Sequence, residues 1–154
     1  MNKSNYLLDI FKSLLKKKEK KKVIRTLSLA PYGCVYNLED IFSSLNQRYF
    51  QNRLAIHVTW GRYYKQASRS RRLGSYDHRK NLITVHPLLD STDFPPYFIS
   101  YIVYHEILHA VYPPFKERGR WVIHHQEFKI MERNFMEYEL AKSWQSQNKA
   151  IFFK

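Results

Sequence analysis

The chain has 154 residues, of which 44% are hydrophobic and 25% charged, so it can form about one folded domain and is neither disordered nor collagen-like. Its single cysteine, Cys34, excludes an internal disulfide and a cysteine-based zinc finger or ribbon, so any metal must be held by histidines and carboxylates. The 26 Lys and Arg residues against 13 Asp and Glu give a net charge of +13, which favours a polyanionic partner such as nucleic acid, although basic side chains can also simply solvate a surface.

The first 30 residues predict a basic amphipathic helix followed by a tail. The apolar positions with helical spacing are Leu7, Leu8, Phe11, Leu14 and Leu15. Six lysines follow between positions 16 and 22. Such a helix could lie on nucleic acid or an anionic membrane, act as a localisation signal, or pack on its own domain with a solvated lysine-rich end.

The order of these groups also bears on location. The lysines come after the apolar stretch, which Asp9 and Lys12 interrupt, and this order is the reverse of a secretory signal peptide. No stretch approaches the roughly 20 apolar residues of a membrane-spanning helix. We therefore expect no transmembrane segment and a cytoplasmic location, or the nucleoid or nucleus if the protein associates with DNA.

Apolar periodicity predicts a helix over residues 37–50 and then changes to the period of strands. Residues 54–60 and 81–86 alternate as strands do, and a third short strand is expected near residues 72–76. Within that third strand, Gly74 would form a bulge or allow a close approach of another group. The segment between the first two strands interleaves basic and aromatic residues, a pattern shared by single-stranded nucleic-acid platforms and ordinary exposed hairpins.

The second half of the chain predicts two more helices. The first covers residues 95–112 and must end there, because Pro113 and Pro114 cannot continue a helix. A basic loop over residues 116–120 then leads to a last helix over residues 123–143. The apolar stripe of this last helix is Phe128, Met131, Phe135 and Tyr138. Helices, a small sheet of roughly three strands and further helices describe an α+β domain.

His105, Glu106 and His109 form the sequence HEILH within the helix predicted over residues 95–112. Histidines at positions i and i+4 lie on one face one turn apart, so both imidazoles can reach one metal ion, and Glu106 can reach a water activated by that ion. The helix is apolar nearly all round, and burying three ionisable groups in it without partners would cost several kcal/mol. A shared metal removes that cost, whereas two core histidines bonded to backbone are the simpler structural alternative.

A catalytic zinc site takes three protein ligands and keeps one position open, so a third ligand is needed. His124 and His125 are the candidates, and only one of them is expected to point at the metal, because neighbouring helical positions differ by about 100° in direction. Glu127 or Glu132 is the rival third ligand. The other histidines are interpreted as ordinary surface or core residues, and they are His57, His78 and His86.

Several stretches between about Leu38 and Phe135 resemble the Spartan-related SprT-like metalloprotease family. They are LNQRYFQNRL, HVTWGR, RRLGSY, ITVHPLL, YHEILHAVY and HHQEF. In that family the HExxH helix is followed by a His, usually a Gly, two further residues and an aromatic. The resemblance therefore places the third ligand at His124 and the aromatic at Phe128, with His125 where the family usually has Gly. The sequence contains no cysteine-rich zinc ribbon such as fuller members of the family carry.

The resemblance implies that residues 31–154 form a small zincin-like domain, a zinc-dependent peptidase that acts on a protein or peptide substrate. One Zn²⁺ would be held by His105, His109 and His124, with Glu106 as the general base in the attack of a metal-activated water on a peptide bond. We further expect an extended substrate to add as a strand to an edge of the sheet. Candidate donors to the transition-state oxyanion are Tyr104, Tyr112, Arg118 and Arg120.

DNA is the second expected partner, and the substrates would then include DNA-associated proteins. The zinc ribbon helps Spartan-like proteins engage DNA, so in this chain basic residues would have to supply a nonspecific electrostatic surface instead. The candidate contacts are Lys16, Lys17, Lys18, Arg69, Arg71 and Arg72. Two alternatives stay open: a nucleic-acid-binding module with a structural or vestigial zinc site, and a small three-histidine nuclease, which the late third histidine disfavours.

Overall fold

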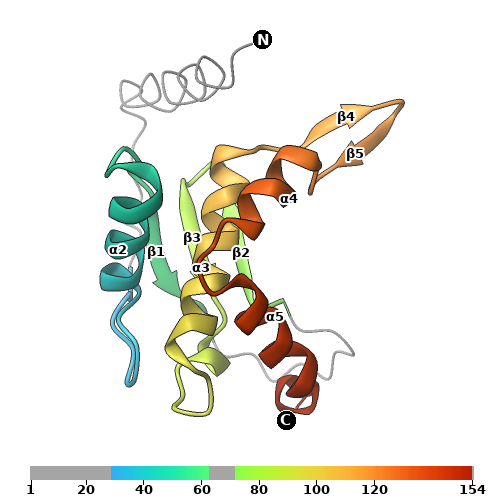
Figure 1. The fold of residues 1–154 in the computed structure, drawn as a ribbon. Coiled ribbons are helices and arrows are strands. Elements are labelled where there is room, and N and C mark those ends of the chain that lie inside the picture. The colour runs from blue at the N-terminus through green and yellow to red at the C-terminus, as the bar shows by residue number, and fades with distance from the viewer. Residues whose placement is uncertain (1–28, 63–71, 154) are drawn as a thin grey trace.

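The computed structural model describes residues 29–62 and 72–153, which form an α+β fold as predicted (Figure 1). The helix expected within the first 30 residues, with its lysines, falls on positions 1–28, which lie outside the described residues, as do positions 63–71. Across the two described ranges, no helix is both long and apolar enough to cross a membrane.

The secondary structure elements fall into two sheets and a set of helices that surround the longest one, α3. In chain order they are α2 (Leu38–Phe50), β1 (His57–Trp60), β2 (Gly74–Asp77), β3 (Leu82–Val85), the short 3₁₀ helix η2 (Pro87–Leu89), α3 (Pro96–Val111), β4 (Phe115–Glu117), β5 (Arg120–Val122), α4 (Gln126–Arg133), α5 (Tyr138–Gln147) and the 3₁₀ helix η3 (Lys149–Phe153). Figure 1 shows α3 in the middle of the molecule, between the first sheet and the helices α4 and α5.

Strands β1, β2 and β3 form the three-stranded sheet that the sequence predicts, in the order β1-β3-β2, although β1 covers only the last four of the predicted residues 54–60. The central strand β3 runs parallel to β1, where Ile83 pairs with Val58, and antiparallel to β2, where Ile83 pairs with Tyr76. Ile83 and Val58 are almost fully buried, because the sheet packs one face on the helices. In the order β1-β3-β2, strand β2 is an outer strand of the part of the sheet that the structure describes.

Helix α2 starts and ends close to the predicted positions. The side chain of Asn37 accepts a hydrogen bond of 3.0 Å from the backbone N–H of Glu39, which satisfies a donor that the first turn leaves free. The helix ends at Phe50, and the two residues that follow it, Gln51 and Asn52, have left-handed φ angles of 54° and 57°. The helix predicted over residues 37–50 is confirmed.

Helix α3 forms the centre of the core, and eleven of its 16 residues are buried. It packs against α2, β2, β3, α4 and α5. It ends at Val111, before Pro113 and Pro114, as predicted. Because these elements enclose α3 on nearly every side, the polar side chains that the helix carries have little freedom to move.

The single last helix predicted over residues 123–143 is wrong, because the segment forms two helices, α4 and α5. The backbone N–H of Phe135 bonds the carbonyl of Glu132, and that of Tyr138 bonds the carbonyl of Phe135, so the chain turns between the helices. The turn places the buried Phe135 ring 5.3 Å from that of Tyr104 and 6.1 Å from that of Tyr49. Burial of this aromatic residue decides where the helix breaks.

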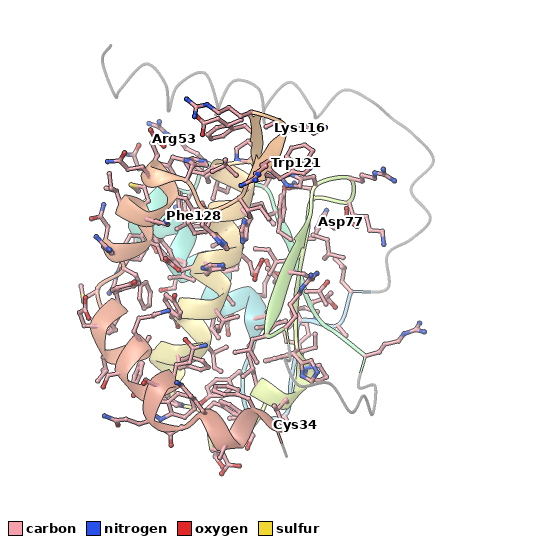
Figure 2. The ribbon with its side chains drawn as sticks, turned by 90° about the vertical axis from the view of Figure 1, so that its right-hand side faces the viewer. Cys34, Arg53, Asp77, Lys116, Trp121 and Phe128 are labelled. Atoms are coloured by element: carbon pink, nitrogen blue, oxygen red, sulfur yellow. The ribbon has the colours of Figure 1, made fainter. Side chains whose placement is uncertain are left out.

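The basic loop predicted over residues 116–120 is also wrong, because β4 and β5 form a β-hairpin. Its two-residue turn has φ angles of 46° at Arg118 and 80° at Gly119, the left-handed pair that matches the twist of a hairpin. The strands have only three residues each, too few for a clear alternation in the sequence. Lys116 and Trp121 on this hairpin lie near the end of the molecule opposite Cys34 (Figure 2).

Candidate metal centre

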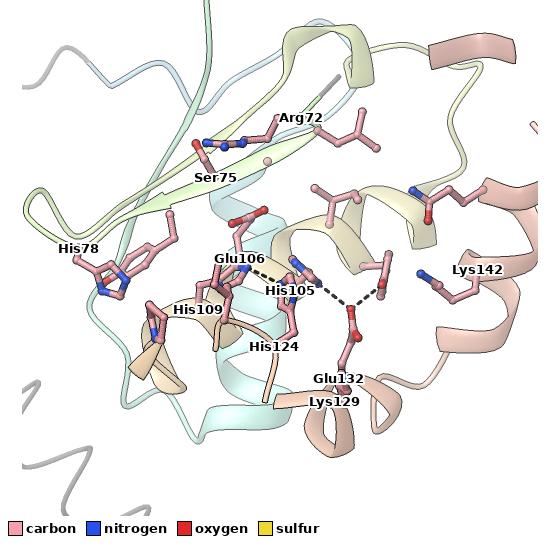
Figure 3. A pocket seen from close by; sticks show the side chains of 18 residues that line it. Arg72, Ser75, His78, His105, Glu106, His109, His124, Lys129, Glu132 and Lys142 are labelled. Atoms are coloured by element: carbon pink, nitrogen blue, oxygen red, sulfur yellow. Dashed lines mark hydrogen bonds and ion pairs between the residues drawn. The ribbon is translucent and has the colours of Figure 1, made fainter. Parts of the chain in front are cut away.

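An open cleft of about 780 Å³ lies between α3, strand β2 and the segment around the start of α4. His105, Glu106, His109 and His124 all line it. Figure 3 shows Glu106 and the three histidines gathered in this cleft, with Ser75 on the strand side. The helix, the sheet edge and the segment between β5 and α4 therefore meet at one surface.

The rings of His105, His109 and His124 form a nearly equilateral group. The distances between ring centroids are 4.9 Å for His105 and His109, 5.1 Å for His105 and His124, and 4.9 Å for His109 and His124. One ring nitrogen from each histidine lies within 4.8 Å of the others, and Nε2 of His124 lies 3.3 Å from Nε2 of His109. Three converging imidazole nitrogens are the donor set that a catalytic zinc ion prefers.

The charge state of this cluster also suits a metal ion. The pKa of His109 is lowered to about 4, mainly by burial and in smaller part by the positive charges that His105, His124 and His78 carry when protonated. The pKa of His124 is lowered for the same reasons, burial first and the charge of His105 second. At neutral pH both rings are therefore uncharged, which is the form of imidazole that binds a metal.

Glu132 on α4 fixes the orientation of His105. Its Oε1 lies 2.7 Å from Nδ1 of His105 and accepts a hydrogen bond of 2.7 Å from the hydroxyl of Tyr101. Burial raises the pKa of Glu132, but the hydrogen bonds from His105 and Tyr101 outweigh that effect, and the net pKa lies below its ordinary value. With Nδ1 engaged by the carboxylate, Nε2 is the nitrogen of His105 that remains for a metal.

His125 is directed away from this cluster. Its ring is buried, lies 5.3 Å from that of Phe115 and 6.0 Å from that of Tyr112, and its Nδ1 lies 2.8 Å from Oε2 of the exposed Glu127. His124 and His125 both precede the first residue of α4, so a bend rather than a helical turn separates their directions. Of the two candidates, the structure groups His124 with the HEILH histidines.

Glu106 lies beneath the edge strand of the sheet. Its side chain is buried, and strand β2 passes so close to it at Gly74 that a larger residue would meet the carboxylate. The close approach expected at Gly74 is therefore present. Burial raises the pKa of Glu106 to about 7, although the positive charges of His105 and Arg72 lower it.

The other proposed functional residues have mixed placements. Arg72 lines the cleft, whereas Lys16, Lys17, Lys18, Arg69 and Arg71 lie outside the described residues. Four residues that were candidate oxyanion donors do not line the cleft, namely Tyr104, Tyr112, Arg118 and Arg120. Tyr104 is fully buried and donates its hydroxyl hydrogen to the carbonyl of Met131.

His78 lines the cleft, although its sequence position gave no sign of this. It follows β2 in the turn to β3, and its ring stands edge-on to that of Tyr76 at 4.7 Å. Its charge contributes to the lowered pKa of His109, so the two rings are close enough to interact. Histidines on the sheet can approach the α3 cluster only through the fold, which is why spacing along the chain did not reveal it. Of the other two, His57 is exposed, and His86 accepts a hydrogen bond from the backbone N–H of Leu88.

A family model described as SprT-like matches residues 38–148, which include the whole candidate centre. No curated protein and no protein of solved structure is similar enough to match. The matched range covers well over half of the chain and runs from the start of α2 to just after the end of α5.

Proposed function

The chain belongs to the SprT-like family, and from that premise and the geometry of its histidine cluster we propose that it is a zinc-dependent peptidase. The observation that carries the proposal is the convergence of His105, His109 and His124 beside a buried carboxylate in an open cleft. Three protein ligands that leave room for substrate and water are typical of catalytic zinc sites rather than of closed structural ones.

The donor set fits a zinc ion. The three imidazoles supply nitrogen ligands from a rigid helix and an adjacent bend, and the low pKa values of His109 and His124 keep them uncharged at neutral pH. Glu132 supports the orientation of His105 from behind. When bound there, Zn²⁺ supplies Lewis acidity that polarises a scissile carbonyl and makes water more acidic.

In this proposal Glu106 moves the proton. Its carboxylate accepts a proton from the attacking water and then delivers it to the nitrogen of the leaving amine. A general base works best when its pKa lies near the working pH, and burial raises the pKa of Glu106 towards neutrality. The close packing of Gly74 against the carboxylate holds that proton acceptor in one place.

Strand β2 is the edge on which we expect an extended substrate to bind. Gly74, Ser75 and Tyr76 of β2 line the cleft, and β2 pairs only with β3 among the described strands. The other outer strand, β1, already has one backbone hydrogen bond on its outer side, from the N–H of Trp60 to the carbonyl of Ala30. Addition of a peptide to β2 would carry its backbone past the histidine cluster.

The test replaces each histidine in turn and measures bound zinc together with cleavage of an unfolded polypeptide. Replacement of His105, His109 or His124 by Gln should remove both zinc and cleavage. His124→Gln and His125→Gln form a matched pair of neighbours, and only the first should lose zinc. Chelation should abolish cleavage in the wild type, and added Zn²⁺ should restore it. Full cleavage by the metal-free protein would refute the proposal.

We also propose that the substrates lie on or near DNA, because the net charge of +13 favours a polyanion and Arg72 places one basic group at the cleft itself. Single-stranded DNA should then increase cleavage of a DNA-binding protein, and the increase should fall steeply as salt concentration rises. Equal rates with and without DNA at low salt would limit the proposal to peptide hydrolysis alone.

A further inference from the structure

The β4–β5 hairpin connects the second and third histidines of the cluster. β4 begins shortly after His109, and His124 follows shortly after β5. The two residues at the base of the hairpin, Pro114 and Ile123, line the metal cleft. The hairpin is therefore a continuation of the cleft wall, and Figure 1 shows it extending outward beyond α3 and α4.

The two faces of this hairpin can be assigned from its register. Lys116 pairs with Trp121, and directly paired residues of an antiparallel ribbon lie on the same face. Alternate residues of a strand also share a face, so this face continues towards Pro114 and Ile123 at the cleft. The opposite face carries the pair formed by Phe115 and Val122.

Among the described residues, the opposite face contacts the body of the protein through Phe115, which is itself 45% exposed. The ring of Phe115 packs 5.3 Å from the ring of the buried His125. This contact orients the hairpin relative to the segment before α4. Trp121 is 62% exposed and Ile123 is 48% exposed, so two large apolar side chains are open to solvent on the face that leads into the cleft.

We propose that this face, which we call the hairpin arm (Lys116, Trp121 and Ile123), binds an extended apolar segment of the polypeptide substrate beside the bond that is cut. The inference rests on the proposed peptidase function and names the kind of substrate segment that the site selects. When a partner covers exposed aromatic side chains beside a cleft, the burial of their apolar surface lowers the free energy of the complex. The amine of Lys116 lies 5.2 Å from the centroid of the Trp121 ring and steadies it.

The chemistry of the arm favours a polypeptide over a nucleic acid. Its base is apolar, and Lys116 is the one cation among its three residues, while the other two basic residues of the hairpin lie elsewhere: Arg118 in the turn, and Arg120 paired in register with Glu117 on the opposite face. The free edges of a two-stranded ribbon can also pair with an extended backbone. Trp121 lies three residues before His124, and three extended residues span at most about 10 Å. A substrate segment over Trp121 would therefore lie about three to five residues from the cleaved bond.

The test compares two peptides that share one cleavage site. One peptide carries an apolar Phe-Leu block three to five residues from that site, and the other carries Ser-Gly at the same place. One pair of peptides has this block on the amino-terminal side of the cleavage site, and a second pair has it on the carboxyl-terminal side. The wild type should prefer the apolar peptide, and Trp121→Ala should lower that preference about tenfold, mainly through a higher KM. Trp121→Phe should keep most of the preference. Leu140→Ala, which removes another exposed apolar side chain away from the cleft, is the matched control and should keep it fully.

A binding measurement separates failure of this inference from failure of the proposed function. In a Glu106→Gln background, the fluorescently labelled apolar peptide should bind more tightly than the Ser-Gly peptide, and Trp121→Ala or Ile123→Ser should weaken that binding, whether or not the wild type cleaves. Zinc content and thermal midpoint are measured for each variant to show that it is folded. Equal peptide binding with and without Trp121 would overturn the inference. It would also be overturned if Trp121→Ala weakened the binding of an oligonucleotide but left the binding of the apolar peptide unchanged.

Discussion

Gly74 in β2 and Glu106 in α3 approach so closely that a Cβ atom on Gly74 would lie 2.7 Å from Oε1 of Glu106. The backbone of β2 therefore packs directly against the carboxylate of Glu106 on α3. The position of the proposed proton acceptor thus depends on the position of the sheet. Because Glu106 is buried, its carboxylate has little room to move aside.

The variant Gly74→Ala should displace this carboxylate. We expect the protein to fold and to keep its zinc, but to lose cleavage by about tenfold or more, because a misplaced general base transfers a proton poorly. Gly61→Ala is the matched control, since its Cβ would lie 3.2 Å from a methyl group of Thr84 and away from the cleft. Steady-state kinetics with metal analysis distinguish the two variants, and unchanged turnover in Gly74→Ala would count against the role of the close contact.

Two carboxylates on α4 each lie within hydrogen-bond distance of a histidine ring. This pair allows a controlled test of whether the carboxylate behind His105 contributes to zinc affinity. Glu132 lies 2.7 Å from Nδ1 of His105, and Glu127 lies 2.8 Å from Nδ1 of His125. Glu132→Gln should weaken zinc affinity by about 10- to 100-fold, the effect typical of losing a carboxylate behind a metal-binding histidine. Glu127→Gln should leave zinc affinity unchanged. Competition with a chelating dye measures both, and equal affinities would show that Glu132 has no part in the metal site.

Asp90 fastens the segment before α2 to the end of η2, and its contribution to stability should depend on pH. Its carboxylate accepts hydrogen bonds from the backbone N–H groups of Cys34, Val35 and Tyr36 at 2.6, 2.9 and 3.0 Å. Burial raises the pKa of Asp90, but these hydrogen bonds outweigh it, so the net pKa lies below the ordinary value of 3.8. A carboxyl with a lowered pKa in the folded state stabilises the protein above its unfolded pKa, and this stabilisation is lost as the pH falls through the folded pKa.

We therefore expect Asp90→Asn to lower the free energy of unfolding by about 1 kcal/mol at pH 7, with a smaller difference from the wild type below about pH 4. Urea unfolding at several pH values measures this. Asp93→Asn, a change at an exposed neighbour, serves as the control. A difference that stays constant down to pH 3 would contradict the proposed hydrogen bonding of the charged form.

The sequence predicts those parts of the fold that local patterns determine. Helix α3 combines an apolar composition with two prolines after its end, and the pair His105 and His109 is recognisable from spacing alone. The break between α4 and α5 could not be predicted, because it depends on the burial of Phe135 among aromatic rings from α2 and α3. Periodicity describes one helix face, whereas this break follows from tertiary packing.

The site shows the same division. The choice between His124 and His125 depends on a bend before α4, where the 100° rule for helices does not apply, so residue reasoning alone left it open. The approach of His78 to the cleft depends on the sheet, which brings the β2–β3 turn towards α3. The turn of the β4–β5 hairpin could in principle be predicted, because its two residues, Arg118 and Gly119, end in a glycine, as two-residue hairpin turns commonly do. The flanking strands have only three residues each, however, and so give little signal in the sequence.

The most direct test of the central claim compares cleavage by the wild type and by Glu106→Gln at equal zinc occupancy. Both proteins are loaded with one equivalent of Zn²⁺, the bound metal is quantified, and an unfolded polypeptide is followed by mass spectrometry for newly formed amino and carboxyl ends. We expect the wild type to produce such ends and Glu106→Gln to be slower by a factor of about 10² to 10⁴, the range typical for loss of a general base. Equal cleavage by the two zinc-loaded proteins would contradict the account.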